Sequence, residues 1–291
     1  MSAPAPFDAR LARLHRARAA AGFPDAAFLH ARGAADLAER LEAIPRRFER
    51  ALVLGAPNLF VRALSPEVRG RIGVIVRADA VAALGEVVLD PENLPFAEQT
   101  FDLIVSPLVL HTVNDLPGAL VQLRRALKPD GLFLAALFAG ETLHELRACL
   151  IEAESELRSG AGPRVAPFAD MLELAGLLQR AGLALPAADR EKIIVRYAEP
   201  LKLLADLRAM GETNALTHRA GPLTRGVLFR ALALYRERFA DPDGRVRATF
   251  EVVTLTGWAP HESQQKPLKP GSAKTRLADA LGAKEAPLPR E

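Results

Sequence analysis

The chain has 291 residues, 49% of them hydrophobic, which is enough to bury one large core and to carry an additional lobe. Its 38 basic and 35 acidic residues are interspersed, so no basic stripe is present and a nucleic-acid partner is not expected. No stretch approaches the ~20 consecutive apolar residues that span a bilayer, so no membrane span is expected.

Residues 1–47 predict a helical N-terminal arm. The stretch FDARLARLHRARAAAGF is rich in arginine and poor in acidic residues, a composition shared with mitochondrial presequences. Because nothing marks a cleavage site, we expect an amphipathic helix with Leu11 and Leu14 packed on the body. This favours a cytoplasmic bacterial protein, with the mitochondrial matrix as the alternative.

Short apolar runs alternate with helical segments after the arm. Strands are expected at 51–55, 71–76, 86–89, 101–106 and 132–138. Continuously apolar runs such as IGVIV and FDLIVS are typical of parallel strands that helices cover on both faces. The alternation predicts an α/β, doubly wound sheet.

The pattern changes after Phe138. Helices are expected at 142–158 and 168–181, then a strand in KIIVRY, helices in PLKLLADLRAM and GVLFRALALYRERF, and a last strand in RATFEVVTLTGW. The helices between the two late strands predict a lobe at about 198–240 inside a domain spanning 48–259. Residues 260–291 are polar and rich in Pro and Lys, and predict a mostly disordered tail.

Cysteine and histidine usage restricts the chemistry. Cys149 is the only cysteine, so an intramolecular disulfide and a zinc site built on cysteines are excluded, and a reducing compartment is favoured. The six histidines form no His-x-Asp/Glu pair. We therefore expect no metal, unless folding brings distant ligands together.

One central segment resembles a known family. Four motifs follow one another in the order typical of class I S-adenosylmethionine (SAM) dependent methyltransferases: VVLDPENLPF, FDLIVS, LVLH and LKPDG. The resemblance implies a Rossmann-like sheet of seven strands whose last strand is antiparallel, and SAM as cofactor.

A resemblance to a more specific family covers nearly the whole chain. Five segments together resemble the methyltransferase-like assembly factors of mitochondrial complex I and their bacterial relatives. They are FDARLARLHRARAA, HTVNDLPGAL, AGETLHELR, MGETN and GWAPHESQQKPLKPGSA. That family includes a protein arginine hydroxylase, so the resemblance implies a protein substrate or partner. The malonyl-carrier-protein methyltransferases are a more distant match.

The first loop departs from the family pattern. The family has Asp/Glu-x-Gly-x-Gly-x-Gly, and Val53, Gly55, Pro57 and Leu59 stand at these places. Only Gly55 agrees. Pro57 has no N–H, and Leu59 puts a branched side chain where the backbone should approach SAM. We therefore expect SAM binding, if any, to be weak.

Other cofactor candidates follow the next strands. In GVIVRADA, Arg77 stands near the place of a ribose-binding acid, where it could meet an anionic ligand or be solvated. Asp79 comes late and could reach back to that place through an unusual loop, although a helix N-cap is the favoured role. Asp90 matches the family's adenine-binding acid, or only forms a turn before Pro91. Ser106 would line the crevice in which open α/β sheets bind ligands.

Substrate-side candidates lie further along the chain. His111 could act as a general base or only shape the cleft. Glu141 and Arg147 come near the end of the fifth strand, where Thr142 and Glu145 also fit a helix capping box.

Glu212 and Asn214, in MGETNAL, would lie in the lobe. A carboxylate there could bind a substrate guanidinium, although an ordinary polar turn at Gly211 is slightly favoured. Two functions remain open: a SAM-dependent enzyme that modifies a protein side chain, and a cofactor-free descendant that serves as an assembly or interaction factor.

Overall fold

The computed structural model describes residues 5–158, 160–219, 221–265 and 282. Contacts divide the chain into two units, 1–260 and 261–291, and the first contains all the described helices and strands. The predicted tail, 260–291, lies mostly outside the described residues. None of the helices described is both long and apolar enough to cross a membrane.

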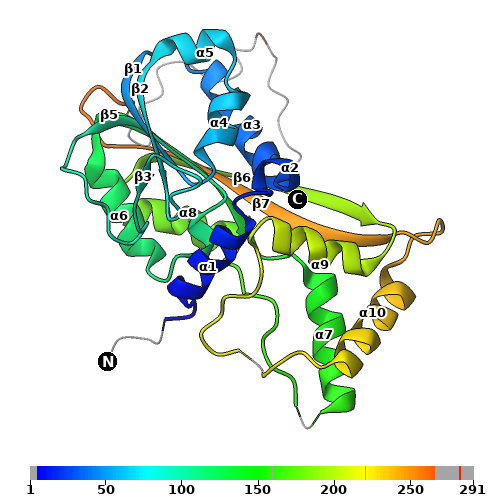
Figure 1. The fold of residues 1–291 in the computed structure, drawn as a ribbon. Helices are drawn as coiled ribbons and strands as arrows, with labels where there is room; N and C mark the ends of the chain where they lie inside the picture. The colour runs from blue at the N-terminus through cyan, green and yellow to red at the C-terminus, as the bar shows by residue number, and fades with distance from the viewer. Residues whose placement is uncertain (1–4, 159, 220, 266–281, 283–291) are drawn as a thin grey trace, which may run out of the picture. The chain divides into compact units, whose positions relative to one another are not determined.

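A seven-stranded sheet forms the centre of the first unit (Figure 1). Its order is β3-β2-β1-β4-β5-β7-β6, and β7 is antiparallel to both of its neighbours. The strands are β1 (Phe48–Leu54), β2 (Ile72–Asp79), β3 (Val87–Val88), β4 (Phe101–Pro107), β5 (Leu127–Ala139), β6 (Ala184–Tyr197) and β7 (Val246–Trp258). The predicted α/β, doubly wound sheet with an antiparallel last strand is confirmed.

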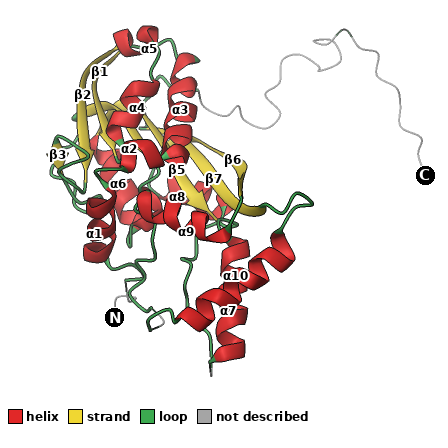
Figure 2. Cartoon of the chain, turned by 45° about the vertical axis from the view of Figure 1, so that its right-hand side comes forward, coloured by secondary structure: helices red, strands yellow, loops and turns green. Residues whose placement is uncertain are grey.

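Helices cover both faces of this sheet (Figure 2). The described helices are α1 (Ala9–Ala19), α2 (Phe23–Ala26), α3 (Phe28–Glu42), α4 (Pro57–Ala63), α5 (Pro66–Arg71), the 3-10 helix η1 (Leu110–Thr112), α6 (Leu116–Ala126), α7 (His144–Leu157), α8 (Met171–Arg180), α9 (Pro200–Ala209) and α10 (Arg225–Phe239), of which α7 and α10 pack on each other in the lobe. Successive strand side chains point to opposite faces, so Val53 packs in the core that includes α3 and α4, and Leu52 in the core that includes α6 and α8.

The parallel register brings three strand ends to one edge. Leu54 pairs with Ala78 of β2, and Val53 pairs with Val105 of β4. The carboxyl ends of β1, β2 and β4 therefore lie side by side, which is where open α/β sheets bind ligands.

The N-terminal arm reaches this edge through polar contacts. Leu14 is 41% exposed, whereas Arg16 and Ala19 are buried, so the expected packing of Leu14 is wrong. The arm begins with a bridge from Phe7 to Leu216, in the loop that follows α9. The arm thus connects the strand ends with the lobe.

Side chains at two helix starts behave differently. Asp115 caps α6 by accepting a hydrogen bond from the Gly118 N–H at 2.9 Å. The capping box at Thr142 and Glu145 is wrong, because β7 runs alongside and takes both side chains. Glu145 accepts from the Thr249 N–H at 3.1 Å.

Candidate functional site

The loop after β1 turns tightly at Gly55. Its φ is +85°, and a Cβ there would lie 2.7 Å from the Cβ of Val109, so only glycine fits without a shift. Ala56 follows with φ 43°, and Pro57 then begins α4. The loop is therefore held against the segment that follows β4.

Asp79 ends β2 and is fully buried. It accepts hydrogen bonds from the Arg16 guanidinium at 2.7 Å, the Val81 N–H at 3.0 Å and the Ala56 N–H at 3.2 Å. The predicted helix cap is wrong, since no helix begins at this point in the described chain. The acid at the end of the second strand is Asp79, and both of its oxygens are occupied.

The remaining cofactor candidates lie around this edge. Arg77 faces outward and pairs with Glu86 and with the Asn58 side chain. Asp90 accepts from the Glu92 N–H at 2.9 Å, which is the expected turn. Ser106 is fully buried, and its hydroxyl has no hydrogen-bond partner within the described residues.

The arm leaves only a small hollow at the strand ends. The cavity that Arg16, Asp90 and Val109 help to line is only about 50 Å³, against roughly 300–1,000 Å³ for small-molecule sites. Nearby, Phe23 and Ala56 belong to an apolar cluster that partly buries Leu59 as well.

A second, larger cavity of about 360 Å³ lies between η1, α7, α9 and the loop after α9. His111 and Glu212, which are 101 residues apart in sequence, meet there: His111 Nε2 lies 3.1 Å from a Glu212 oxygen. Leu146, Leu204 and several other apolar side chains line the same cavity. Arg164, Arg208 and Arg219 also line this cavity, so folding places one carboxylate in a hollow with leucine walls and guanidinium groups in its lining.

His30, from α3, completes this cluster. Its Nε2 lies 3.2 Å from the other Glu212 oxygen, and its ring packs edge-on against Phe23 and Phe138. Both ring nitrogens of His30 and the Nδ1 atom of His111 make no hydrogen bond with the described residues. His111 therefore contacts Glu212 through a hydrogen bond, and His30 through proximity alone.

The surroundings shift the pKa values of both Glu212 and His30 downward. Burial alone would raise the pKa of Glu212, but the adjacent His111 and His30 outweigh it and hold that pKa well below its usual range. Burial lowers the pKa of His30 although Glu212 opposes the shift. The result is a carboxylate with 13% of its side chain exposed toward the cavity.

The other substrate-side candidates are divided between two places. Asn214 lines the cavity; its amide accepts from the Leu216 N–H and donates to the Pro163 carbonyl at 3.3 Å. Arg147 donates to the Thr142 and Ala166 carbonyls, and Glu141 pairs with Lys192 at 2.8 Å outside the cavity. Folding therefore unites His111, Glu212 and Asn214, but not Glu141.

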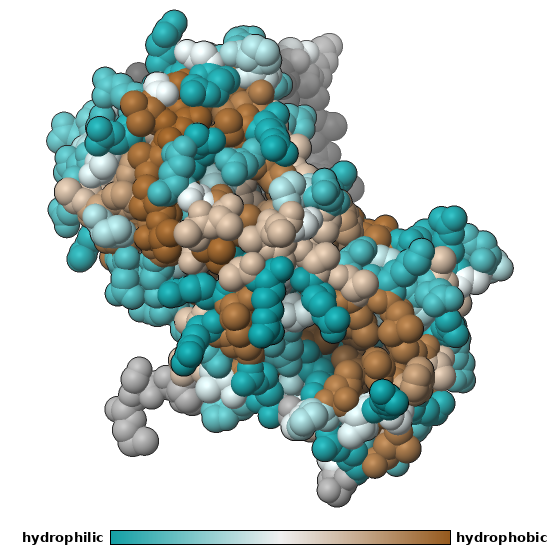
Figure 3. Space-filling view, viewed as in Figure 1, coloured by the Kyte–Doolittle hydropathy of each residue, from teal (hydrophilic) through white to brown (hydrophobic). Residues whose placement is uncertain are grey.

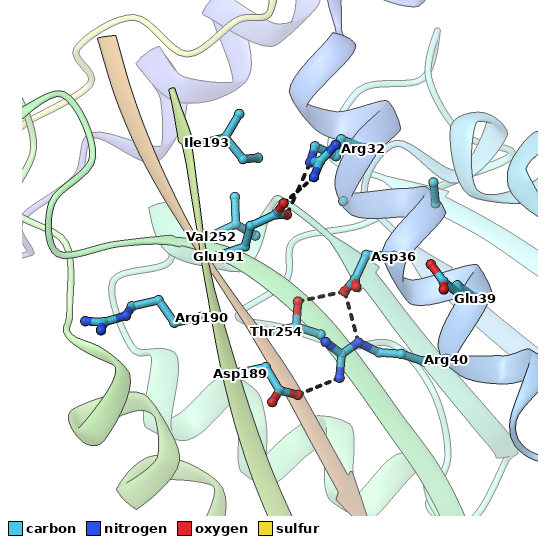
Figure 4. Close-up of a pocket in the computed structure, with 12 residues that line it drawn as sticks. Arg32, Asp36, Glu39, Arg40, Asp189, Arg190, Glu191, Ile193, Val252 and Thr254 are labelled. Atoms are coloured by element: carbon cyan, nitrogen blue, oxygen red, sulfur yellow. Dashed lines mark hydrogen bonds and ion pairs between the residues drawn. The ribbon is translucent and has the colours of Figure 1, made fainter. Parts of the chain in front are cut away.

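A groove of about 300 Å³ between α3 and strands β6 and β7 is also lined by charged groups (Figure 4). These charges neutralise one another: Arg40 pairs with Asp36 and Asp189, and Arg32 with Glu191. Because most of its carboxylates and guanidinium groups pair with one another, and Glu39 and Arg190 stand apart from those pairs, we do not regard it as the functional site.

Sequence reasoning missed His30 and Arg16. Both lie in helices that were expected to pack through apolar residues, and only the fold brings them to distant acids. Across the described residues, no group of three His, Cys, Asp or Glu side chains is placed to hold a metal ion. The two histidines instead approach different oxygens of one carboxylate.

Comparisons with known proteins agree with this architecture. The family described as "Methyltransferase domain" matches residues 73–135. Human mitochondrial arginine-hydroxylase NDUFAF5 is 41% identical over 246 residues, covering 81% of this chain and 71% of the human protein. The Danio rerio protein of the same name is 44% identical over 193 residues, and the match spans 60% of its length.

Two further similarities extend the comparison. A malonyl-[acyl-carrier protein] O-methyltransferase of Halorhodospira halophila is 33% identical over 87% of this chain and 88% of that enzyme. The crystal structure of the Bacillus YcgJ protein matches with a TM-score of 0.50 and 16% identity, covering 77% of this chain and 98% of that one. This structural match concerns the fold alone.

Proposed function

Because the chain belongs to the class I methyltransferase family that includes the mitochondrial arginine hydroxylase NDUFAF5, we propose that it binds an arginine side chain of a partner protein in the cavity of Glu212 and acts as an assembly or interaction factor. The observation that carries the proposal is the Glu212 carboxylate, whose pKa is lowered, in a cavity with leucine walls that Arg164, Arg208 and Arg219 also line. A guanidinium is the side chain that best matches a carboxylate in geometry and charge.

The cavity also suits the rest of an arginine side chain. Leu146, Leu204 and Leu207 supply apolar wall against which the methylene stem would lie while its charged end reaches Glu212. The carboxylate has lone pairs beyond those directed at the two imidazoles, so it can accept further hydrogen bonds.

A protein partner is supported by the surface of the lobe. Phe229, Leu157 and Ile151 are 64%, 54% and 46% exposed on α10 and α7. Apolar surface gathers over these helices in the lower right of Figure 3. Exposed apolar surface of this kind favours contact with another protein. We propose that contact occurs in the bacterial cytoplasm, with the mitochondrial matrix as the alternative.

Membership of the family implies SAM binding. For this chain we propose that the SAM site is degenerate and closed, on the basis of Pro57 and Leu59 in the loop and of Arg16 on Asp79. A SAM-dependent enzyme is the second candidate, and it is favoured by the unpartnered Ser106 hydroxyl at the end of β4. In that case the arm would have to move away from the strand ends.

Isothermal titration calorimetry with SAM and S-adenosylhomocysteine separates these candidates. We expect no binding heat from the folded protein, as judged by circular dichroism. Micromolar binding that Asp90→Ala abolishes would overturn the closed site and support the enzyme. Heat that appears only in Arg16→Ala would mean that the arm alone blocks an otherwise complete site.

Arginine recognition is tested with Nα-acetyl-arginine amide and its citrulline analogue, followed by protein NMR. We expect the arginine compound to perturb resonances around the cavity, the uncharged citrulline compound to do so much less, and Glu212→Gln to abolish the difference. Glu141→Gln is the matched control, because Glu141 is a carboxylate outside the cavity. Equal perturbation by both compounds would rule out the proposed guanidinium site.

A further inference from the structure

We propose that the partner segment is acidic on either side of its arginine and lies in the groove between α1 and α9. The inference rests on the proposed function, since it concerns the chain that carries the bound arginine. It names a second binding surface, built from the guanidinium groups of Arg18, Arg208 and Arg219, and the last two of these residues also line the cavity of Glu212.

The groove between α1 and α9 has a volume of about 870 Å³ and adjoins the cavity. The two hollows share Arg208, Thr213 and Asn214 in their lining. Ala19, Ala205 and Ala209 are also among the groove's lining residues, and their small side chains allow a peptide backbone to approach closely. A chain whose one side chain enters the cavity can therefore continue along the groove.

The charge of the groove has one sign. Arg18 and Arg208 line it together with His15, and none of its lining residues is acidic. Arg219 lines the adjoining cavity and lies near His15. The pKa of His15 is lowered by burial, and the positive charges of Arg18 and Arg219 add to that effect against a backbone hydrogen bond to Thr213. The groove is therefore a positive environment.

These guanidinium groups are available to a ligand. The side chains of Arg18, Arg208 and Arg219 are exposed and make no hydrogen bond or ion pair with any described residue. Arg164, which lines the same cavity, is instead paired with Glu154 at 2.6 Å. In the groove between α3 and strands β6 and β7, by comparison, Arg32 and Arg40 are both paired with carboxylates.

An acidic peptide meets both surfaces at once. Its arginine would be positioned on Glu212, while flanking Asp or Glu side chains would pair with the three unpaired guanidinium groups. A peptide with neutral or basic flanks would satisfy only the cavity. The groove thereby distinguishes among arginines according to the residues around them.

Fluorescence anisotropy with labelled heptapeptides tests the inference. One peptide carries a central arginine with Asp and Glu on both sides, the second has Asn and Gln in their places, and the third has lysines. We expect the acidic peptide to bind about tenfold more tightly than the neutral one at low salt, since each exposed ion pair contributes only modestly. The triple variant R18Q/R208Q/R219Q should remove this preference.

Arg62→Gln is the control for loss of one charge, because Arg62 lies on α4 outside both hollows. Equal affinity for acidic and neutral peptides, or a preference that survives the triple variant, would overturn the inference. So would complete competition by inorganic phosphate at the concentration of the peptide, which would indicate an anion site without peptide recognition.

A central citrulline separates this inference from the proposed function. If Glu212 reads the arginine, citrulline weakens the acidic and neutral peptides by the same factor and leaves the acidic preference intact. If citrulline changes nothing but the acidic preference persists, the guanidinium site fails while the groove stands.

Discussion

Asp79, which is fully buried, and Glu212, which is partly buried, have opposite surroundings. Asp79 faces a charged guanidinium and two backbone N–H groups, which occupy both of its oxygens. Glu212 faces two imidazoles and retains 13% of its side-chain exposure toward a cavity of about 360 Å³. The difference teaches that the partners around an acid decide its role. An acid whose oxygens are both hydrogen-bonded holds the fold together, whereas an acid beside a cavity can accept further hydrogen bonds.

The same contrast extends to packing. At the strand ends, the N-terminal arm leaves a hollow of only about 50 Å³, and Phe23 adds an apolar contact over the loop after β1. In the lobe, the side chains around Glu212 line a wall without filling the space they enclose. The family's ligand edge is thus the denser of the two regions.

Asp79→Ala should give the largest loss of stability. It leaves the Arg16 guanidinium buried without its partner and two N–H groups unpaired, so we expect the free energy of unfolding to fall by about 3–5 kcal/mol. Urea denaturation measures this. The double variant R16M/D79A, which removes the stranded charge as well, should recover part of the loss.

Asp90→Ala is the matched control at the same edge. Asp90 accepts one backbone hydrogen bond within a turn, so its loss should cost about 1 kcal/mol. If the two alanine variants were equally destabilised, the Arg16–Asp79 tie would not be what closes this edge.

The sheet could be predicted from the sequence because its signal is local. Continuous apolar runs such as FDLIVS fix a buried strand whatever surrounds them, and the observed β4 spans 101–107 against the predicted 101–106. The predicted second strand, 71–76, ends three residues before the observed end at Asp79. The prediction followed the apolar run, and Arg77 and Asp79 are polar, so they were left out of it. The strand length was set by pairing with β1 and β3.

The candidate site could be predicted only in part. His111 and Glu212 each had local features that drew attention, yet nothing in the sequence joined them across 101 residues. His30 gave no signal, since a histidine within an apolar helix face resembles ordinary core. Long-range pairs of this kind arise from topology, which places α3, η1 and the loop after α9 around one point.

The lobe cluster should make the protein sensitive to mild acid. Because the folded-state pKa of His30 is lowered, only the unfolded chain takes up that proton as pH falls below about 6.5, and stability declines. The lowered pKa of Glu212 acts in the same direction: its contribution is present above its ordinary value of 4.5 and is lost as pH falls below it. One proton gives a slope of at most about 1.4 kcal/mol per pH unit.

Urea denaturation between pH 7 and pH 5 measures this slope. His30→Asn should flatten it, even though the variant is less stable throughout because the buried ring is lost. His218→Asn, at an exposed histidine, should leave the slope unchanged. A wild-type slope retained in His30→Asn would mean that the lobe cluster is not the source of the acid sensitivity.

Asn114→Ala should have the smallest effect and should act on both regions together. The Asn114 amide accepts from the Phe7 N–H at 2.7 Å and donates to the Phe7 carbonyl at 3.1 Å, so it fixes the start of the arm that fills the strand edge and walls the cavity. We expect a loss of about 1 kcal/mol and faster amide hydrogen exchange in α1. Asn58→Ala, which removes only an exposed contact to Arg77, is the matched control and should leave α1 unchanged. If exchange in α1 were the same in both variants, the Arg16–Asp79 pair alone would hold the arm, and the two regions would be independent of each other at this point.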